Sequence, residues 1–268
     1  MKGPTPSKRY RQKVEAGDWY LVPGDIHHDK QDQPAVTAMM EWWDKKTWMR
    51  RRGVVPQGDS LDLWGLSRYP KSAKKIWTDS QLMKEADAAR PFLEWASAQP
   101  LGCKMILGNH EKRLEAVLDE NPSLHGCPGV EFGAMTGLDD IEGLEILDWN
   151  SQVWLGDKCC IRHGDAPGFP KTCSAVCKKY PDQVTLFGHT HRLGAEFVTV
   201  YGDDGLPQVR GAYNVGHLSL LPEYYDDPDW HLGFAEIEFF GDRGNGQPFF
   251  RVGLHHIFRD SKGNCHVA

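Results

Sequence analysis

Five short segments place an aspartate, asparagine or histidine beside a glycine, and each follows an apolar run typical of a β-strand. The segments are residues 24–27, 58–62, 108–111, 163–165 and 188–191. In α/β proteins the carboxyl ends of strands form the crevice in which ligands bind, so polar side chains placed there can converge on one site. Glycine lets the backbone turn sharply while the neighbouring side chain points into the crevice. The pattern therefore predicts an α/β fold with a polar site at its strand ends.

The residue types in these segments are those that bind divalent metal ions. Imidazole and carboxylate together suit Zn, Fe or Mn, and none of the segments contains cysteine. Side chains two apart on an extended segment point the same way, which pairs Asp25 with His27 and His189 with His191. One such segment alone is usually a turn or a helix cap. Five in one chain, each at a strand exit, instead predict a shared metal site.

The rest of the chain alternates strands with helices and then becomes rich in strands, which predicts layered sheets of mixed direction in one domain. The expected strands are 19–22, 53–55, 103–107, 158–162, 183–187, 197–201, 208–214, 233–240 and 249–258. The expected helices are 34–52, 72–99 with an interruption at residues 90–91, 111–119 and 171–180. Residues 121–147 are expected to be loop with short elements. Residues 1–17 are polar and are expected to be a mobile arm, or an arm packed on the domain.

Charge and cysteine content narrow the class of protein. The net charge is −6, yet residues 1–75 hold 15 Lys/Arg against 9 Asp/Glu, a balance of +6 that leaves −12 for the remainder. This basic stretch is either a solvated surface or a contact for a polyanion. The seven cysteines include Cys173 and Cys177 at helical spacing, but no second pair completes a zinc knuckle. Without a signal-like start or a run of ~20 apolar residues, a reduced cytoplasmic protein is expected, with no membrane partner.

Taken in order, the five segments read Asp-x-His, Gly-Asp-x-x-Asp, Gly-Asn-His-Glu, His and Gly-His-x-His. This series resembles the calcineurin-like metallophosphoesterase superfamily, and residues 59–64 followed by 67–71 also resemble phosphoesterases encoded by phages and bacteria. The resemblance covers residues 24–191, and the strand-rich remainder is compatible with it. It implies a four-layer α/β/β/α sandwich of two mixed sheets flanked by helices, formed by residues 1–268 as a single domain. For a phage-encoded protein the location would be the host cytoplasm.

The resemblance also implies a role for each motif residue. Two divalent metal ions are implied, with Mn, Fe, Zn and Ni as candidates. Asp25, His27 and His191 would hold one metal; Asn109, His163 and His189 would hold the other; and Asp59 would bridge them. His110 would be the catalytic histidine near the leaving group, and Asp62 would orient it.

Four residues are candidate substrate contacts. Arg68 and Arg113 could clamp a phosphate because guanidinium matches its geometry, although both are equally explicable as surface charges. His28 stands where family members often have glycine, and it is either a substrate contact or a solvated or core-packed histidine. His217 ends an Asn-Val-Gly-His segment where the family often has Asn-Pro-Gly-Ser, and it could approach the site.

The expected function is a two-metal phosphoesterase acting on phosphodiesters, phosphomonoesters or both. Two cations about 3.5–4 Å apart can share a water and lower its pKa, giving the metal-bound hydroxide that attacks phosphorus. One alternative is a metal-dependent DNA or RNA nuclease, favoured by the basic residues 45–52 and 71–75 and by tryptophans that could stack bases. Another is a non-catalytic metal-binding module. The expected partner is a phosphate ester, with nucleotides and nucleic acids as candidates.

Overall fold

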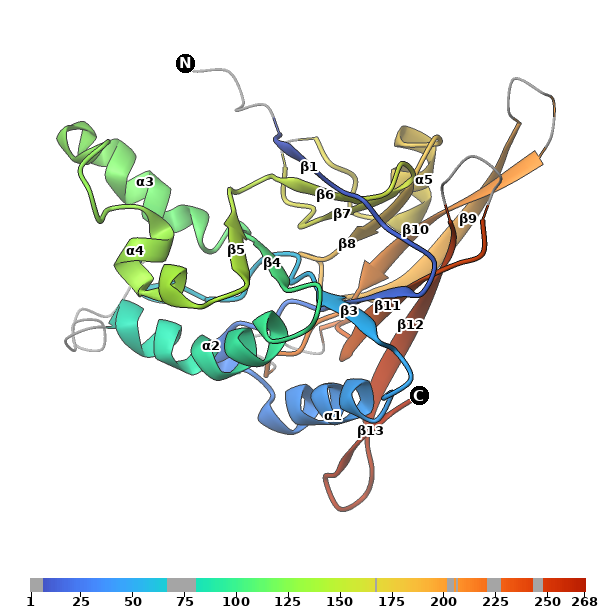
Figure 1. Cartoon of the computed structure of the whole chain (residues 1–268). Coiled ribbons are helices and arrows are strands. Elements are labelled where there is room, and N and C mark those ends of the chain that lie inside the picture. The colour runs from blue at the N-terminus through green and yellow to red at the C-terminus, as the bar shows by residue number, and fades with distance from the viewer. Residues whose placement is uncertain are drawn as a thin grey trace.

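The computed structural model describes residues 7–66, 81–166, 168–201, 205, 207–220, 228–242 and 248–268. Two β-sheets are stacked face to face, and helices cover their outer faces (Figure 1). In the larger sheet, the four strands that come first in the chain are parallel to one another. Each of the three that come last pairs antiparallel with its neighbour.

The seven-stranded sheet has the order β13-β12-β11-β2-β3-β4-β5. Its strands are β2 (Asp18–Pro23), β3 (Arg51–Val54), β4 (Cys103–Ile106), β5 (Leu144–Leu147), β11 (Gly233–Phe240), β12 (Phe249–Arg259) and β13 (Cys265–Val267). All six residues of β2 are buried, as expected for a central strand that is covered on both faces.

The six-stranded sheet has the order β1-β6-β7-β8-β10-β9 and is also mixed in direction. Its strands are β1 (Arg9–Gln12), β6 (Gln152–Leu155), β7 (Cys159–Arg162), β8 (Val184–Phe187), β9 (Leu193–Tyr201) and β10 (Pro207–Val215). Strand β1 comes from the polar arm and pairs in parallel with β6, so this part of the arm is packed on the domain.

Three clusters of buried apolar side chains define the layers within the described residues. The first lies between the seven-stranded sheet and helices α1 (Gln33–Asp44) and α2 (Gln81–Ser97), with Trp43 and Leu93 fully buried. The second fills the space between the sheets, and the third packs α5 (Cys173–Lys179) onto the six-stranded sheet. The order is therefore helix, sheet, sheet, helix (Figure 1), and the expected α/β/β/α sandwich of two mixed sheets is confirmed.

Two expected helices differ from the observed ones. The helix expected at 34–52 ends at Asp44, because the chain must turn to bring Arg51 beside Asp18 in the β2–β3 ladder. Helix α2 continues through Pro91, where an interruption was expected. Proline costs one backbone hydrogen bond, but the buried neighbours Phe92 and Leu93 hold this turn against the core. Residues 72–80 of that expected helix lie outside the described residues.

Short elements lie between the strands of the larger sheet. Helix α3 (Lys112–Glu120) lies where a helix was expected at 111–119, and α4 (Phe132–Thr136) precedes β5 in the region 121–147 that was expected to be loop with short elements. Two 3-10 turns, η1 (His28–Lys30) and η2 (Trp64–Leu66), follow the first two motifs directly.

No helix among the described residues has both the length and the apolar character needed to traverse a bilayer.

Candidate metal centre

The five motif segments leave the carboxyl ends of strands in both sheets. Asp25, Asp59 and Asn109 follow β2, β3 and β4 of the larger sheet, whereas His163 and His189 follow β7 and β8 of the smaller one. The stacking of the sheets therefore brings the two sets of side chains together across the sandwich.

The motif glycines are required because functional groups of other segments lie against them. A Cβ atom at Gly58 would lie 2.4 Å from Nδ1 of His163, and one at Gly108 would lie 2.2 Å from Oδ1 of Asp59. These distances are shorter than any contact a real Cβ makes, so a side chain at either position would displace a candidate metal ligand. Sequence reasoning assigned these glycines to sharp turns, whereas the structure adds the close approach of a neighbouring strand exit.

Four candidate ligands have a strained backbone. His27, Asp59, His189 and His191 adopt left-handed conformations with φ of 48°, 49°, 66° and 58°. Only two other non-glycine residues among those described, Leu63 and Asn150, have positive φ. Such conformations cost of order 1–3 kcal/mol each and persist only where the surroundings impose them, which is typical of functional sites.

The carboxylates and imidazoles form two adjacent groups. In the first, candidate ligand atoms of Asp59, His163 and His189 lie within 4.8 Å of one another, and those of His27, Asp62 and His110 do the same in the second. Oxygen Oδ2 of Asp59 faces both groups, lying 3.2 Å from Nε2 of His163, 3.8 Å from Nε2 of His110 and 4.0 Å from Nε2 of His27. This carboxylate is thus placed between the groups, as a bridging ligand would be.

The other expected ligands adjoin these two groups. Oδ1 of Asn109 lies 3.0 Å from Nε2 of His163, and Nε2 of His191 lies 3.2 Å from Oδ2 of Asp25. Asp25 is fully buried, and it accepts hydrogen bonds from the backbone N–H of His189 at 2.7 Å and from Nε2 of Gln57 at 2.5 Å. All seven expected metal-ligand residues are therefore brought together.

Several buried nitrogens of the site make no hydrogen bond to any described residue. They are both ring nitrogens of His27, Nδ1 of His163 and Nδ1 of His191. For His27, Nδ1 lies 3.4 Å from Oδ1 of Asp62 without forming a hydrogen bond. Buried polar atoms without partners are rare in folded proteins, and imidazole nitrogens beside carboxylates are metal-ligand chemistry. The donor set therefore fits divalent cations.

The carboxylates also set the protonation of the imidazoles around them. Burial alone would lower the pKa of His163, but the charge of Asp59 and their hydrogen bond raise it from 6.5 to about 10. For His189, burial and the charge of His163 lower the pKa to about 4. In His110 the burial effect is outweighed by Asp59 and by the hydrogen bond to Asp62, so its pKa is raised. In the protein without cations, the imidazolium charge of His163 therefore offsets the buried carboxylates, and a metal ion bound to His163 would displace this proton.

His110 contacts Asp62, the residue that the resemblance implies would orient it. Nδ1 of His110 lies 2.7 Å from Oδ1 of Asp62 and 2.9 Å from the Asp62 backbone carbonyl, and its Nε2 faces Asp59. His27, Asp62 and His110 also form one of the possible metal-binding groups. Both oxygens of Asp62 are already engaged, one by His110 and the other by Lys30. This favours an orienting role for Asp62 over direct ligation.

The two groups line a cavity of about 200 Å³. Its walls also include Lys30, Ser219, Leu220 and Trp230, none of which the motifs pointed to. In the sequence, Lys30 stands three residues after His27, and Ser219 and Leu220 follow the segment that ends at His217, whereas nothing nearby marks Trp230. The structure joins that segment to the first motif, because the Leu218 N–H bonds the Asp25 carbonyl at 2.7 Å.

The four candidate substrate contacts fall in different places. Arg113 donates to the Asp62 carbonyl at 2.6 Å and lies 3.3 Å from Nε2 of His110, beside the cavity. His217 is buried behind the site, with its ring stacked on that of His191 at 5.2 Å between centroids. His28 is buried against Phe92 and does not line the cavity, which corrects the substrate-contact expectation in favour of core packing. Arg68 lies outside the described residues.

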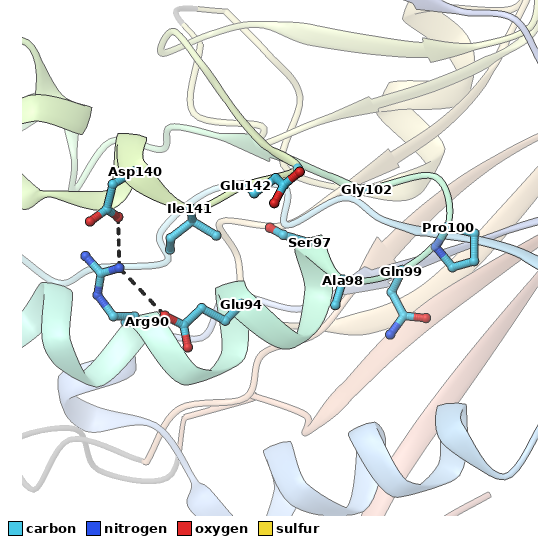
Figure 2. A pocket seen from close by; sticks show the side chains of 11 residues that line it. Arg90, Glu94, Ser97, Ala98, Gln99, Pro100, Gly102, Asp140, Ile141 and Glu142 are labelled. Carbon is cyan, nitrogen blue, oxygen red and sulfur yellow. Dashed lines mark hydrogen bonds and ion pairs between the residues drawn. The ribbon is translucent and has the colours of Figure 1, made fainter.

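A second hollow lies away from this centre, between the end of α2 and the turn that precedes β5 (Figure 2). Its cation, Arg90, is already engaged, because it pairs with Asp140 at 2.9 Å and with Glu94 at 3.7 Å. None of the expected site residues lines it. The metal centre is therefore the better candidate for chemistry.

Comparison with known proteins adds little to this geometry. No protein-family model matches the chain, and no curated protein matches it. Among solved structures, the chain is similar to wild-type Vps29 from Entamoeba histolytica, whose crystal structure was determined in complex with Zn²⁺. The identity is 13%, the TM-score is 0.41, and the match covers 93% of this chain and 98% of that one. We draw no conclusion about function from a likeness at this level.

Proposed function

We propose that this protein is a two-metal phosphoesterase of the calcineurin-like superfamily that its motifs resemble. The observation that carries the proposal is the buried carboxylate of Asp59, which faces imidazoles of both candidate metal-binding groups. One carboxylate shared between two sets of nitrogen ligands is the arrangement that a dinuclear centre needs. The unpartnered nitrogens of His27, His163 and His191 support the same assignment.

The ligands that we propose form two sets, which regroup the residues described above. Asp25, His27 and His191 would hold one divalent cation, Asn109, His163 and His189 would hold the other, and Asp59 would be shared. When bound, the cations lower the pKa of a water between them and offset negative charge on the phosphoryl oxygens. Gln57 and the His189 N–H fix the Asp25 carboxylate through its two oxygens, so the ligand is oriented before any cation arrives.

His110 supplies the proton that the leaving oxygen needs. Its Nδ1 donates a hydrogen bond to Oδ1 of Asp62, so the ring is fixed with Nε2 towards Asp59 and the cavity. A histidine in this position can donate to a departing alkoxide, which contributes typically 10²–10⁴-fold to the rate. Asp62 orients this ring and favours its protonated form.

The test is metal binding and hydrolysis measured on the same preparation. Metal analysis after dialysis against Mn²⁺, Ni²⁺ or Zn²⁺ should give two ions per chain. The loaded protein should hydrolyse bis(p-nitrophenyl) phosphate or p-nitrophenyl phosphate, and His110→Ala should lower kcat at least about 100-fold while keeping both ions. Two bound ions with equal, background rates in both proteins would instead indicate a non-catalytic metal-binding module.

The nuclease alternative gains no support from the described residues. Lys46 contacts Glu236 at 3.2 Å and lies 3.6 Å from the centroid of the Trp42 ring, while Arg51 pairs with Asp18 at 2.5 Å. Lys46 is thus engaged inside the protein and Arg51 at its surface, which leaves Lys45 of the basic stretch 45–52 largely exposed, and residues 71–75 lie outside the described residues. Cleavage of single-stranded DNA or RNA in the presence of Mn²⁺, together with binding that weakens steeply as the salt concentration rises, would support the nuclease hypothesis.

A further inference from the structure

Lys30 is the single lysine or arginine among the described residues that line the metal cavity. It ends η1 and is anchored through its backbone, since its N–H bonds the His27 carbonyl at 2.6 Å and its carbonyl accepts from Leu220 N–H at 2.8 Å. The residue therefore belongs to the same wall as Leu220 and Ser219, and its ammonium group stands at the cavity with a side chain that is 46% exposed.

The ammonium group shares Asp62 with His110. Lys30 binds Oδ2 of this carboxylate, and Nδ1 of His110 binds Oδ1 at 2.7 Å. The opposite nitrogen of His110, Nε2, faces Asp59 at 3.8 Å. One imidazole ring thus separates the Lys30–Asp62 pair from the shared carboxylate, so Lys30 lies on the His110 side of the cavity, away from Asp59. A leaving group that takes its proton from His110 departs on this side.

We propose that Lys30 binds an anionic oxygen of the leaving group and so makes the site selective for phosphate esters whose leaving group carries further phosphate. This inference rests on the proposed phosphoesterase function. A lysine ammonium has three N–H donors, and Asp62 accepts from one of them. The Trp64 ring, whose centroid lies 5.4 Å from Nζ, supports the cation from another side and limits its freedom.

Substrates that differ only in their leaving groups separate this role from simple support of Asp62. In AMP the leaving group is a neutral nucleoside, whereas in ADP and ATP it carries one or two phosphates. A charge-assisted hydrogen bond from Lys30 to such a phosphate should favour ADP and ATP over AMP about tenfold. If Lys30 only neutralised Asp62, its loss would affect all three nucleotides alike.

The experiment compares the metal-loaded wild type with Lys30→Gln, Lys30→Arg and Lys45→Gln. Lys45 is a matched control because its side chain is 77% exposed and pairs only with Glu41 in the described residues. Inhibition constants of AMP, ADP and ATP are measured against bis(p-nitrophenyl) phosphate at a fixed concentration of free Mn²⁺. We expect Lys30→Gln to bring the AMP-to-ADP ratio close to one, Lys30→Arg to keep it, and Lys45→Gln to leave it unchanged.

Two results would overturn the inference: a wild type with no preference for ADP over AMP, or a preference that survives in Lys30→Gln. A fall in kcat for bis(p-nitrophenyl) phosphate with an unchanged nucleotide ratio would assign Lys30 to positioning Asp62 alone. A wild type that binds two metals but hydrolyses nothing would refute the proposed function instead. In that case, calorimetric titration of the wild type and of Lys30→Gln with AMP and ADP would test whether Lys30 binds the additional phosphate, because binding can be measured without turnover.

Discussion

At Asp59, a single carboxylate oxygen faces imidazole nitrogens of three residues, His27, His110 and His163, at 3.2–4.0 Å. The other oxygen accepts the backbone N–H of His110 at 3.0 Å. Asp62 is also buried, but its oxygens contact His110, His27 and Lys30 within one of the two groups. The two aspartates are three residues apart in sequence, yet only Asp59 is shared between the groups.

This difference predicts different losses for the two aspartates. Asp59→Asn removes the charge that both cations would share, so we expect metal content after dialysis to fall from two ions per chain to one or none. Asp62→Asn should keep both ions but lower kcat by about 10–100-fold, because His110 loses its orienting partner. Metal analysis and kinetics on the same samples test this. An Asp59→Asn protein with full metal content would contradict the bridging role.

Gly108 allows a second test at a single atom. A methyl group here would lie 2.2 Å from Oδ1 and 2.5 Å from the backbone nitrogen of Asp59, so Gly108→Ala should weaken metal binding and lower the free energy of unfolding by about 1–3 kcal/mol. Gly194→Ala is the control, because a methyl group there meets no atom within 4 Å. Calorimetric metal titration and urea unfolding measure the two effects. Equal behaviour of the two variants would argue against the close packing.

The side chains that sequence reasoning missed act through tertiary contacts. Gln57 precedes the second motif, but its importance comes from Asp25, which belongs to a different strand exit. Lys30 similarly depends on Asp62, 32 residues away in the chain. No local pattern marks either residue, whereas the metal-ligand motifs are visible because their residue types are unusual beside glycine.

At the scale of elements, strands followed by a motif were predictable, whereas the edge strands β1, β5 and β13 were not. The runs before residues 24, 108, 163 and 188 are apolar and buried, and they form β2, β4, β7 and β8. By contrast, β1 alternates exposed and half-buried residues, and β5 is buried only at Leu147. Such strands are defined by their pairing partners, here β6 and β4, and the sequence of a short segment does not reveal which strand it pairs with.

The contact between α1 and β11 gives a prediction with a defined pH dependence. Glu236 on β11 lies 3.2 Å from Lys46 Nζ, just after α1, and 3.3 Å from His255 Nε2 on β12. Burial would raise the pKa of Glu236, but the hydrogen bond with His255 and the charge of Lys46 lower it below the ordinary 4.5. The stabilisation is therefore complete above about pH 4.5 and is lost as the pH falls through the folded-state pKa.

We expect Glu236→Gln to lower the free energy of unfolding by about 1–2 kcal/mol at pH 7 and by much less at pH 3. The control is Glu41→Gln, whose carboxylate is 62% exposed and pairs with Lys45, so it should change stability by less than about 0.5 kcal/mol. Urea unfolding at both pH values provides the measurement. The same loss at pH 7 and pH 3 would show that the charge of Glu236 is not what stabilises the contact.

At the scale of the whole molecule, the candidate centre depends on how the two sheets are stacked. Asp59 leaves the larger sheet and His163 the smaller one, yet their side chains lie 3.2 Å apart. The apolar cluster between the sheets fixes this relation, with Val22 and Ile106 on one side and Ile161 and Leu186 on the other. Sequence reasoning could predict each strand exit, but the register between two sheets follows from packing across the whole sandwich.

Strand β1 is the first connection between the two sheets, and its removal tests whether fold and site can be separated. Residues 9–12 pair with β6 of the smaller sheet, and the chain then passes to β2 of the larger one, with Val14 buried on the way. The N–H of Gly17 also bonds the Phe239 carbonyl at 2.7 Å. The arm thus covers the edge of β6 without supplying any candidate ligand.

We expect a protein that begins at residue 13 to lose about 2–4 kcal/mol of unfolding free energy, because four ladder residues and the packing of Tyr10 are removed. The uncovered edge of β6 should also promote self-association, visible by size-exclusion chromatography. Metal content at low temperature should remain at two ions per chain. Replacing Arg9 and Arg11 by glutamine keeps the ladder and removes the cations beside the Trp154 ring and the exposed Arg11–Asp157 pair, so it should cost less than about 1 kcal/mol. Loss of metal from the shortened protein before any loss of folded structure would mean that the arm helps to build the site, and the separation between fold and site would fail.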